Sequence, residues 1–220
     1  MRTRRWWIRL CIVLVWALRP GRADAVMVIN EILADPPSLT GDANGDGIIS
    51  STQDEFIELL NTAADSISLA NWSLSDLAQV RHVFSSSSSI PGYSFFVVFG
   101  GASPQGFTHV AVASSGGLSL NNTGDTITLR DADGILVDTV ADGSEGGRDV
   151  SLTRVPDGTG SFVLHSSVNH LAFSPAKTVD GRSTVSVPDD PVVPEPSSFS
   201  LLTGGLLGCS FTSLRRRLPT

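Results

Sequence analysis

Residues Gly41 to Asn61 carry the pattern in this chain that is best suited to chemistry. Side-chain oxygens recur there at every second position, a glycine that permits a sharp turn follows, and the next carbonyl can point back to the same centre. Hard cations such as Ca²⁺ take oxygen ligands in this arrangement. The predicted calcium ligands are Asp42, Asn44, Asp46, the carbonyl of Ile48, Asp54 and Glu55.

The closing position of this acidic loop, residues 41–55, departs from the usual calcium pattern. The twelfth position normally holds a carboxylate that gives two oxygens, but here it is Gln53, and Asp54 and Glu55 follow one and two residues late. Either a distorted loop lets one of them close the shell, or the site binds weakly or not at all. Asp, Asn and Gly are also the residues of tight turns, so a turn that binds nothing is the alternative.

The charge balance of the middle of the chain bears on its partners. Between about residues 26 and 194 there are 20 acidic and 6 basic side chains, a net charge of −14, although the whole chain has a formal charge of −7. Such a surface repels a phosphate backbone, whose binding depends on Lys and Arg. We therefore predict no nucleic-acid partner and favour divalent cations as partners.

The first 25 residues have the three parts of an export signal. A basic stretch, Arg2 to Arg5, precedes an apolar stretch, Trp6 to Leu18, and Ala23 and Ala25 form an A-x-A-like cleavage site. We expect the export machinery to remove residues 1–25; the alternative is an uncleaved N-terminal anchor. Both cysteines lie in the terminal segments, so the exported middle has no disulfide framework.

Short strand-forming runs fill the middle of the chain. They are rich in β-branched and aromatic residues, many alternate apolar with polar positions, and Gly, Pro, Ser, Asn and Asp clusters separate them. The sequence Asp131-Ala132-Asp133-Gly134 predicts a tight hairpin, and the serines Ser85 to Ser89 predict a solvated loop. The pattern predicts an all-β, antiparallel sandwich or partly closed barrel. The runs are VMVINEIL (26–33), DEFIELL (54–60), SISL (66–69), VRHVF (80–84), SFFVVF (94–99), THVAVA (108–113), TITLR (126–130), ILVDTV (135–140), VSLTR (150–154) and SFVLH (161–165).

Catalytic motifs do not stand out in this chain. No serine lies in a G-x-S-x-G elbow, and the four histidines share no spacing typical of a zinc site. A pair of carboxylates for glycoside hydrolysis is possible in any acidic β-domain. We predict no catalytic residues and no enzyme, with a secreted hydrolase as the alternative.

Several segments resemble the lamin-tail domain of exported bacterial proteins. The opening resembles the family at Val28 to Leu33, Asp54 to Asn61 and Ser68 to Asp76, and the later strands at Leu118 to Val140 and Ser151 to Arg154. The resemblance implies an immunoglobulin-like antiparallel β-sandwich over residues 26–180. It also implies an adhesive or anchoring module, although fold alone does not give function.

The polar and aromatic residues of these family segments have structural interpretations. We expect Asn30 and Asn61 to hydrogen-bond local backbone at strand ends, Glu58 to face solvent or cap the acidic loop, and Trp72 to anchor the core. Glu31 and Glu58 are two carboxylates near the loop, and such neighbours tolerate each other better with a cation between them.

The C-terminal part changes character after residue 180. A Pro-rich linker over residues 181–193 should be extended. The order of parts that follows resembles a PEP-CTERM sorting signal over residues 194–220, with Phe199 to Phe211 as its apolar segment. The defining residues of this signal are Pro194, Glu195, Pro196, Arg215, Arg216 and Arg217. The resemblance implies that an exosortase cuts near Pro196 after the segment has held the protein in the inner membrane. A permanent single-span tail anchor is the alternative.

Together these features predict a non-catalytic exported β-sandwich at the cell surface or in an exopolysaccharide matrix, with a structural or adhesive role and a calcium-stabilised loop. Its partners would be polysaccharide or another matrix protein. A plain spacer is a further alternative, which would lack an exposed aromatic platform; Tyr93 and Phe107 are the candidates for one.

Overall fold

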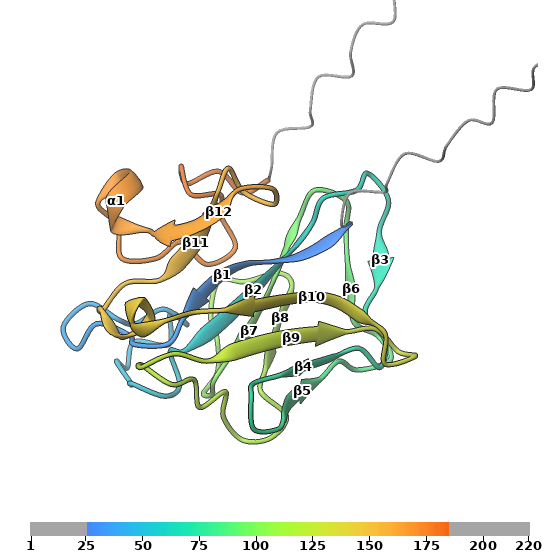
Figure 1. The fold of residues 1–220 in the computed structure, drawn as a ribbon, viewed down its shortest axis with the longest axis horizontal. Coiled ribbons are helices and arrows are strands. Elements are labelled where there is room, and N and C mark those ends of the chain that lie inside the picture. Colours follow the sequence, from blue (N-terminus) through green and yellow to red (C-terminus); the bar gives the residue numbers. More distant parts are fainter. Residues whose placement is uncertain (1–25, 185–220) are drawn as a thin grey trace, which may run out of the picture. The chain divides into compact units, whose positions relative to one another are not determined.

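Residues 26–184, the part of the chain that the computed structural model describes, fold as a β-sandwich (Figure 1). Within this range the strands form a six-stranded sheet, a four-stranded sheet and a small two-stranded sheet. The six-stranded sheet has the order β12 (Ser161–Leu164), β11 (Leu152–Val155), β1 (Met27–Leu33), β2 (Phe56–Asn61), β7 (Phe95–Phe99) and β8 (Val110–Val112). The four-stranded sheet has the order β10 (Leu136–Ala141), β9 (Thr126–Arg130), β4 (Ser73–Ser75) and β5 (Val80–Val83). The two-stranded sheet pairs β3 (Ile67–Ser68) with β6 (Ser89–Ile90), and the short helical turns are η1 (Ser144–Gly147) and α1 (Ser166–Asn169).

This architecture confirms the predicted all-β, immunoglobulin-like fold, with one correction to its antiparallel description. Strands β7 and β8 are parallel, with Val97 opposite Val110. The reason is the connection between them: residues 100–109 carry the chain back to the starting end of β7 before β8 begins. Strand β4 was not predicted, and β6 takes in Ser89, which we had expected to lie in a solvated loop.

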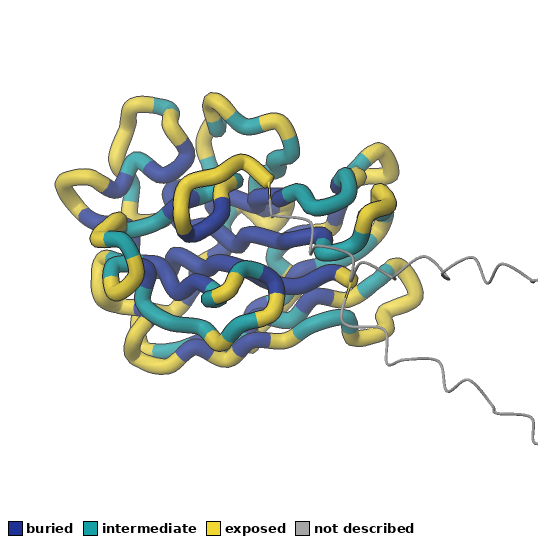
Figure 2. The backbone as a smooth tube through the Cα atoms, turned by 90° about the horizontal axis from the view of Figure 1, so that it is seen from above, coloured by how far each residue is buried: buried dark blue, intermediate teal, exposed yellow. Residues whose placement is uncertain are grey.

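The main core lies between the two large sheets. In β2 and β7 every residue is buried, and alternate side chains point to opposite faces. Ile57, Leu59, Phe96 and Val98 face the four-stranded sheet, where they join the apolar side chains of β4, β9 and β10. Each of these buried side chains stabilises the fold by roughly 1.5–3 kcal/mol. Figure 2 shows the result, with buried central strands and exposed loops around them.

The outer face of the six-stranded sheet is also covered. Phe56, Val97 and Phe99 point to this face and pack against Phe173 and Ala176, which follow the last strand. The covering segment, residues 171–182, is called the C-terminal strap below. Its last hydrogen bonds join Thr178 and Arg182. The central strands β2 and β7 are therefore buried on both faces, which explains the imperfect alternation of the β2 sequence.

A β-bulge in β1 decides which side chains reach the outer face. The pairing of β1 with β2 shifts register between Ile29 and Glu31. Ile29 and Ile32 both belong to the main core, whereas Leu33 belongs to the outer cluster. The extra residue therefore places Asn30 and Glu31 together on the outer side, because a bulge redirects the side chains around it. Without the bulge, regular alternation would point Glu31 into the apolar core.

The predicted hairpin between β9 and β10 is confirmed. The two strands are antiparallel, and Gly134 has φ of 77°. Glycine adopts this left-handed conformation without steric cost. The side chain of Asp131 closes the turn by accepting the N–H groups of Asp133 at 3.0 Å and Ile135 at 2.8 Å.

Candidate functional site

The acidic loop is held by hydrogen bonds from its own backbone to its own side chains. Asp42 accepts the N–H of Gly47 at 3.0 Å, Asn44 accepts that of Asp46 at 3.0 Å, and Asp46 accepts that of Ile48 at 2.8 Å. Gly47 has φ of 88°, which supports the sharp turn that the sequence predicted. The loop is thus ordered by local contacts.

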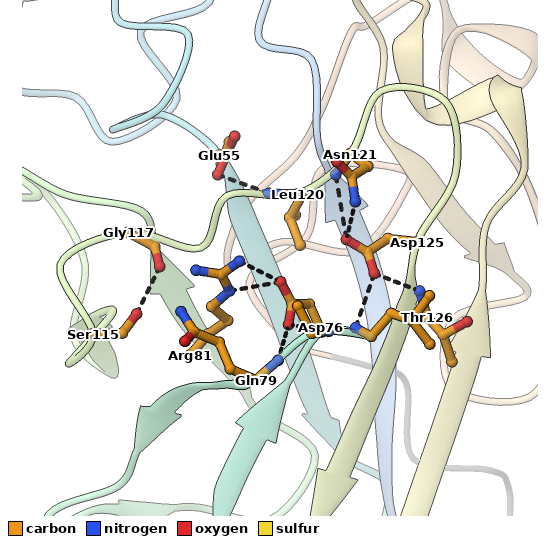
Figure 3. Close-up of polar contacts among 12 residues, drawn as sticks. Glu55, Asp76, Gln79, Arg81, Ser115, Gly117, Leu120, Asn121, Asp125 and Thr126 are labelled. Carbon is orange, nitrogen blue, oxygen red and sulfur yellow. Dashed lines mark hydrogen bonds and ion pairs between the residues drawn. The ribbon is translucent and has the colours of Figure 1, made fainter.

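The structure brings Asp54, but not Glu55, to this loop. Asp54 is buried and accepts the N–H groups of Asn44 at 3.0 Å and Ser50 at 2.8 Å. Glu55 instead accepts the N–H of Leu120 at 3.3 Å, on the connection that precedes β9 (Figure 3). Burial raises the pKa of Glu55 to about 7. Of the two carboxylates predicted to close the calcium shell, only Asp54 contacts the loop.

One observation in the loop fits a cation. Oδ1 of Asp42 is buried and has no hydrogen-bond partner within the described residues. A bare carboxylate oxygen is a suitable ligand for Ca²⁺. However, no group of three or more His, Cys, Asp or Glu side chains among residues 26–184 is arranged to hold a metal. The calcium site, including the predicted carbonyl ligand of Ile48, stays a prediction.

A second group of carboxylates lies between the sheet and the strap, and its form was not predicted. Glu31 and Glu58 are opposite each other on β1 and β2, and both are fully buried. Glu58 neither faces solvent nor caps the acidic loop, as the sequence suggested. It accepts hydrogen bonds from the side chain of Asn30 at 3.0 Å and from the backbone N–H of Ala176 at 2.7 Å.

Glu31 joins three parts of the chain. Its Oε1 accepts from the hydroxyl of Ser151 at 2.5 Å and from the N–H of Ser174 at 2.9 Å, and its Oε2 lies 3.0 Å from the Ser174 hydroxyl. Burial raises its pKa to about 7. Burial, followed by the charge of Glu31, raises the pKa of Glu58 well above its usual range. The pair therefore favours its uncharged form.

The local backbone bonds predicted for Asn30 and Asn61 are found for Asn61, but the prediction for Asn30 is wrong, because its partners are distant in the sequence. Asn61 donates to the backbone carbonyls of Asp65, Ile90 and Pro91, which confirms its predicted backbone contacts. Asn30, at the bulge, bonds the side chains of Glu58 and Asp157 and accepts the N–H of Gly158. The signal for this site in the sequence is the three-residue spacing of Ile29 and Ile32, which breaks the strand alternation.

A cavity of about 670 Å³ opens beside the strap. Phe107, His109, Phe173, Ser174 and Lys177 are among its lining residues. The Ser174 hydroxyl lies 2.9 Å from Nε2 of His165, a geometry seen in hydrolytic serine–histidine pairs. The same hydroxyl lies 3.0 Å from a carboxylate oxygen of Glu31. An oxyanion formed there would face this carboxylate, whereas catalysis requires donors at that position.

A third polar cluster holds together the loops beside β4, β5 and β9 through hydrogen bonds and an ion pair (Figure 3). Asp76 forms an ion pair with Arg81 at 2.5 Å and accepts the N–H of Gln79 at 2.6 Å. Asp125 accepts the N–H groups of Leu77 and Thr126. These carboxylate oxygens already bond protein donors, so the cluster serves to hold loops together. Trp72, the predicted anchor, is only partly buried at the edge of the main core.

Some predicted sites lie outside the described residues 26–184. These are the cleavage-site residues Ala23 and Ala25 and the sorting residues Pro194, Glu195, Pro196, Arg215, Arg216 and Arg217. Within the described range no helix has the length and apolar character needed to cross a membrane.

Comparison with known families identifies two parts of the chain. The lamin tail domain matches residues 20–144, which is more than half of the sequence, and the PEP-CTERM protein-sorting motif matches residues 192–217. No curated protein matches the chain. Strands β11 and β12 and the C-terminal strap lie beyond the lamin-tail match, yet they complete the six-stranded sheet and cover its outer face. Both matched families are non-catalytic modules. The chain therefore belongs to the lamin tail domain family, and its PEP-CTERM motif marks it as an exported protein that an exosortase sorts to the cell surface.

Proposed function

We propose that the mature protein is a non-catalytic structural or adhesive module of the cell surface or the exopolysaccharide matrix. The order of parts in the chain carries this proposal. A β-sandwich ends with the hydrogen bonds of Arg182, and the sorting motif begins at residue 192, so nine residues, 183–191, connect them. An exosortase that cuts near Pro196 would release the sandwich with a short tail. The partners of the released module would be polysaccharide or another matrix protein.

The test of sorting replaces Pro194, Glu195 and Pro196 by alanine in a bacterium that carries an exosortase. We expect the full-length precursor to accumulate in the inner membrane and the surface form to disappear. The matched control replaces Pro188 and Pro191 of the same linker by alanine and should be processed normally. A triple variant that reaches the surface at the wild-type size and amount would show that the motif is not used.

The surroundings of Ser174 support a non-catalytic role over the alternative of a secreted hydrolase. Its hydroxyl is shared between Glu31 and His165, and no donor pair for an oxyanion is evident among these contacts. Glu31 and Glu58 bond protein groups, which leaves no position for a sugar between them. Detectable turnover of glycan or ester substrates would favour the hydrolase instead, if Glu31→Gln or Glu58→Gln abolished that turnover.

We also propose that Ca²⁺ stabilises the acidic loop. Asp42, Asn44 and Asp46 would supply side-chain oxygens, Ile48 its carbonyl, and Asp54 the closing carboxylate in place of Gln53. The bare oxygen of Asp42 supports this proposal. Extracellular calcium modules bind with dissociation constants of about 10⁻⁴ to 10⁻³ M, so the ion would matter at the cell surface.

A further inference from the structure

The C-terminal strap is attached to the sheet through the buried glutamates. Ser174 donates its N–H to Glu31 at 2.9 Å, and Ala176 donates its N–H to Glu58 at 2.7 Å. Phe173 and Ala176 add apolar contacts with the outer cluster. The attachment of this segment therefore depends on two carboxyl groups that have no access to water.

Burial favours the uncharged form of Glu31, whereas its donors on Ser151 and Ser174 favour the charged form. His165 is fully buried, and burial lowers its pKa, so its ring is neutral. If Nδ1 donates to the carbonyl of Leu171 at 3.2 Å, Nε2 is left to accept from the Ser174 hydroxyl at 2.9 Å. The same hydroxyl lies 3.0 Å from Oε2 of Glu31, to which it donates when Glu31 is ionised and from which it accepts when Glu31 carries a proton. Ionised Glu31 would compete with His165 for the single serine proton.

Other charged groups near the pair do not offset its ionisation. Asp157 lies in the turn between β11 and β12, bonds Asn30 and the N–H of Val179, and adds negative charge. Lys177, Asp180 and Arg182 lie on the exposed side of the strap, and Asp180 pairs with Arg182. When both glutamates ionise, two like charges are opposite each other in a dry site, which costs free energy.

The number of residues between the last contact of the strap and the sorting motif limits the maximum reach of the motif. With the strap attached up to Arg182, the nine residues 183–191 span at most about 30 Å. With residues 171–182 released, the free segment grows to 21 residues, 171–191, which span at most about 70 Å. Attachment of the strap therefore shortens the maximum reach of the motif by about half.

We propose that the strap is a latch, which is closed while Glu31 and Glu58 are uncharged and opens when they ionise. The second half of the proposal is that the latch sets the distance over which an exosortase can reach the sorting motif. The second half of this inference rests on the proposed sorting. The first half rests only on the contacts between the strap and the sheet.

The chain provides a direct test, because Lys177 is its single lysine. An endoproteinase specific for lysine can cut the full chain only after Lys177, within the strap. The backbone there is bonded, with Lys177 N–H to Ser174 and Thr178 N–H to Arg182, so cutting requires release of the strap. The cleavage rate of the full chain in detergent is divided by that of a free peptide of residues 171–184, which corrects for the pH dependence of the protease.

We expect this ratio to rise with pH. If release of the strap returns the pKa of Glu31 from about 7 to its ordinary value of 4.5, linkage through Glu31 alone gives a rise of about tenfold between about pH 6 and pH 8.5, and ionisation of Glu58 adds to it. Glu31→Gln should reduce the rise, because the amide N–H₂ can donate to Ser174 as the protonated acid does. The double variant Glu31→Gln/Glu58→Gln should show a flat ratio. Asp180→Asn, which removes an exposed strap carboxylate, is the matched control and should keep the wild-type rise.

The outcomes separate the latch from the sorting proposal. If the cleavage-rate ratio of the wild-type protein does not change with pH, the latch is overturned. This measurement does not depend on whether any variant folds. A rise that persists unchanged in a folded Glu31→Gln variant also overturns it. Sorting is measured independently by the alanine variant of Pro194 to Pro196. Slower precursor processing in the double glutamine variant supports control of reach, and processing at the wild-type rate overturns that part.

Discussion

The acidic loop and the glutamate pair are two carboxylate clusters that differ in their burial and in how far along the chain their hydrogen-bond partners lie. In the loop, Asp42 and Asp46 are partly exposed and bond the backbone within six residues of themselves. In the pair, Glu31 and Glu58 are fully buried and bond residues more than a hundred positions away. Local bonding leaves a loop that can respond to an added cation. Distant bonding makes the carboxylates part of the fold.

The largest difference between the clusters should appear when one carboxylate is deleted from each. Glu58→Ala removes the acceptor of the buried Ala176 N–H and one of the two acceptors of the Asn30 amide, and it opens a cavity, so the free energy of unfolding should fall by about 4 kcal/mol. Asp46→Ala in chelator removes one local turn bond and should cost less than about 1 kcal/mol. Urea unfolding of the full chain measures both. Equal losses would contradict the distinction between the two clusters.

The pH dependence of stability should follow the buried glutamates, since burial raises the pKa values of Glu31, Glu55 and Glu58. The pKa of Glu31 is raised to about 7 in the folded protein, from 4.5. Its contribution is therefore complete below about pH 4.5 and is lost as the pH rises through about 7, with a total of about 3 kcal/mol.

Two buried histidines act in the opposite direction. Burial lowers the pKa of His82 and of His165, so their contribution is complete above their ordinary value of 6.5 and is lost as the pH falls from there through their lowered pKa values. Glu31→Gln isolates the contribution of Glu31, because it should make the alkaline side of the profile shallower, with Glu55 and Glu58 still contributing, and leave the acid side unchanged. Denaturant unfolding at several pH values gives both sides. An alkaline side that is as steep in the variant as in the wild type would assign the loss to other groups.

Calcium should stabilise the protein through the loop alone. At about ten times the dissociation constant, binding adds about 1.4 kcal/mol, which for a domain of this size raises the melting temperature by about 3–6 °C. Thermal unfolding of the full chain in chelator and then in millimolar calcium measures the shift. Asp46→Ala should remove it, and Asp133→Ala, in the β9–β10 hairpin, should not. If no shift occurs in the wild type, the loop is a turn without a cation.

The smallest expected effect distinguishes ligand binding from loop folding. Asp42→Asn keeps an oxygen for the N–H of Gly47 but replaces the bare carboxylate oxygen. In chelator its melting temperature should match the wild type, since one exposed hydrogen bond is worth at most about 1 kcal/mol. The calcium shift should disappear. A large loss of stability in chelator would mean that Asp42 mainly supports the fold.

Much of the fold was predictable from local pattern. The runs that became β2 and β7 are rich in β-branched and aromatic residues, and the Asp131 to Gly134 turn has the sequence that its hairpin requires. Strand β4, with the sequence Ser-Leu-Ser, was missed because its pairing with β5 and β9 outweighs its weak propensity. The parallel pairing of β8 was missed because it depends on the path of a loop.

The candidate sites were also predictable only where their hydrogen bonds join residues close in the sequence. The loop geometry of Asp42, Asn44 and Asp46 followed from spacing, because its bonds join residues at most five positions apart. The orientation of Glu55 and the burial of Glu58 did not, because each is set by a distant segment, at Leu120 and at Ala176.

The sequence alone determined the class of fold, the acidic turn and the order of export and sorting parts, because each is written in neighbouring residues. Only the tertiary structure decided that a bulge at Asn30 brings Glu31 beside Glu58 and that the C-terminal strap covers both. Side-chain direction in a strand reverses with one inserted residue, and burial depends on what packs above it. Neither quantity is contained in a local stretch of sequence.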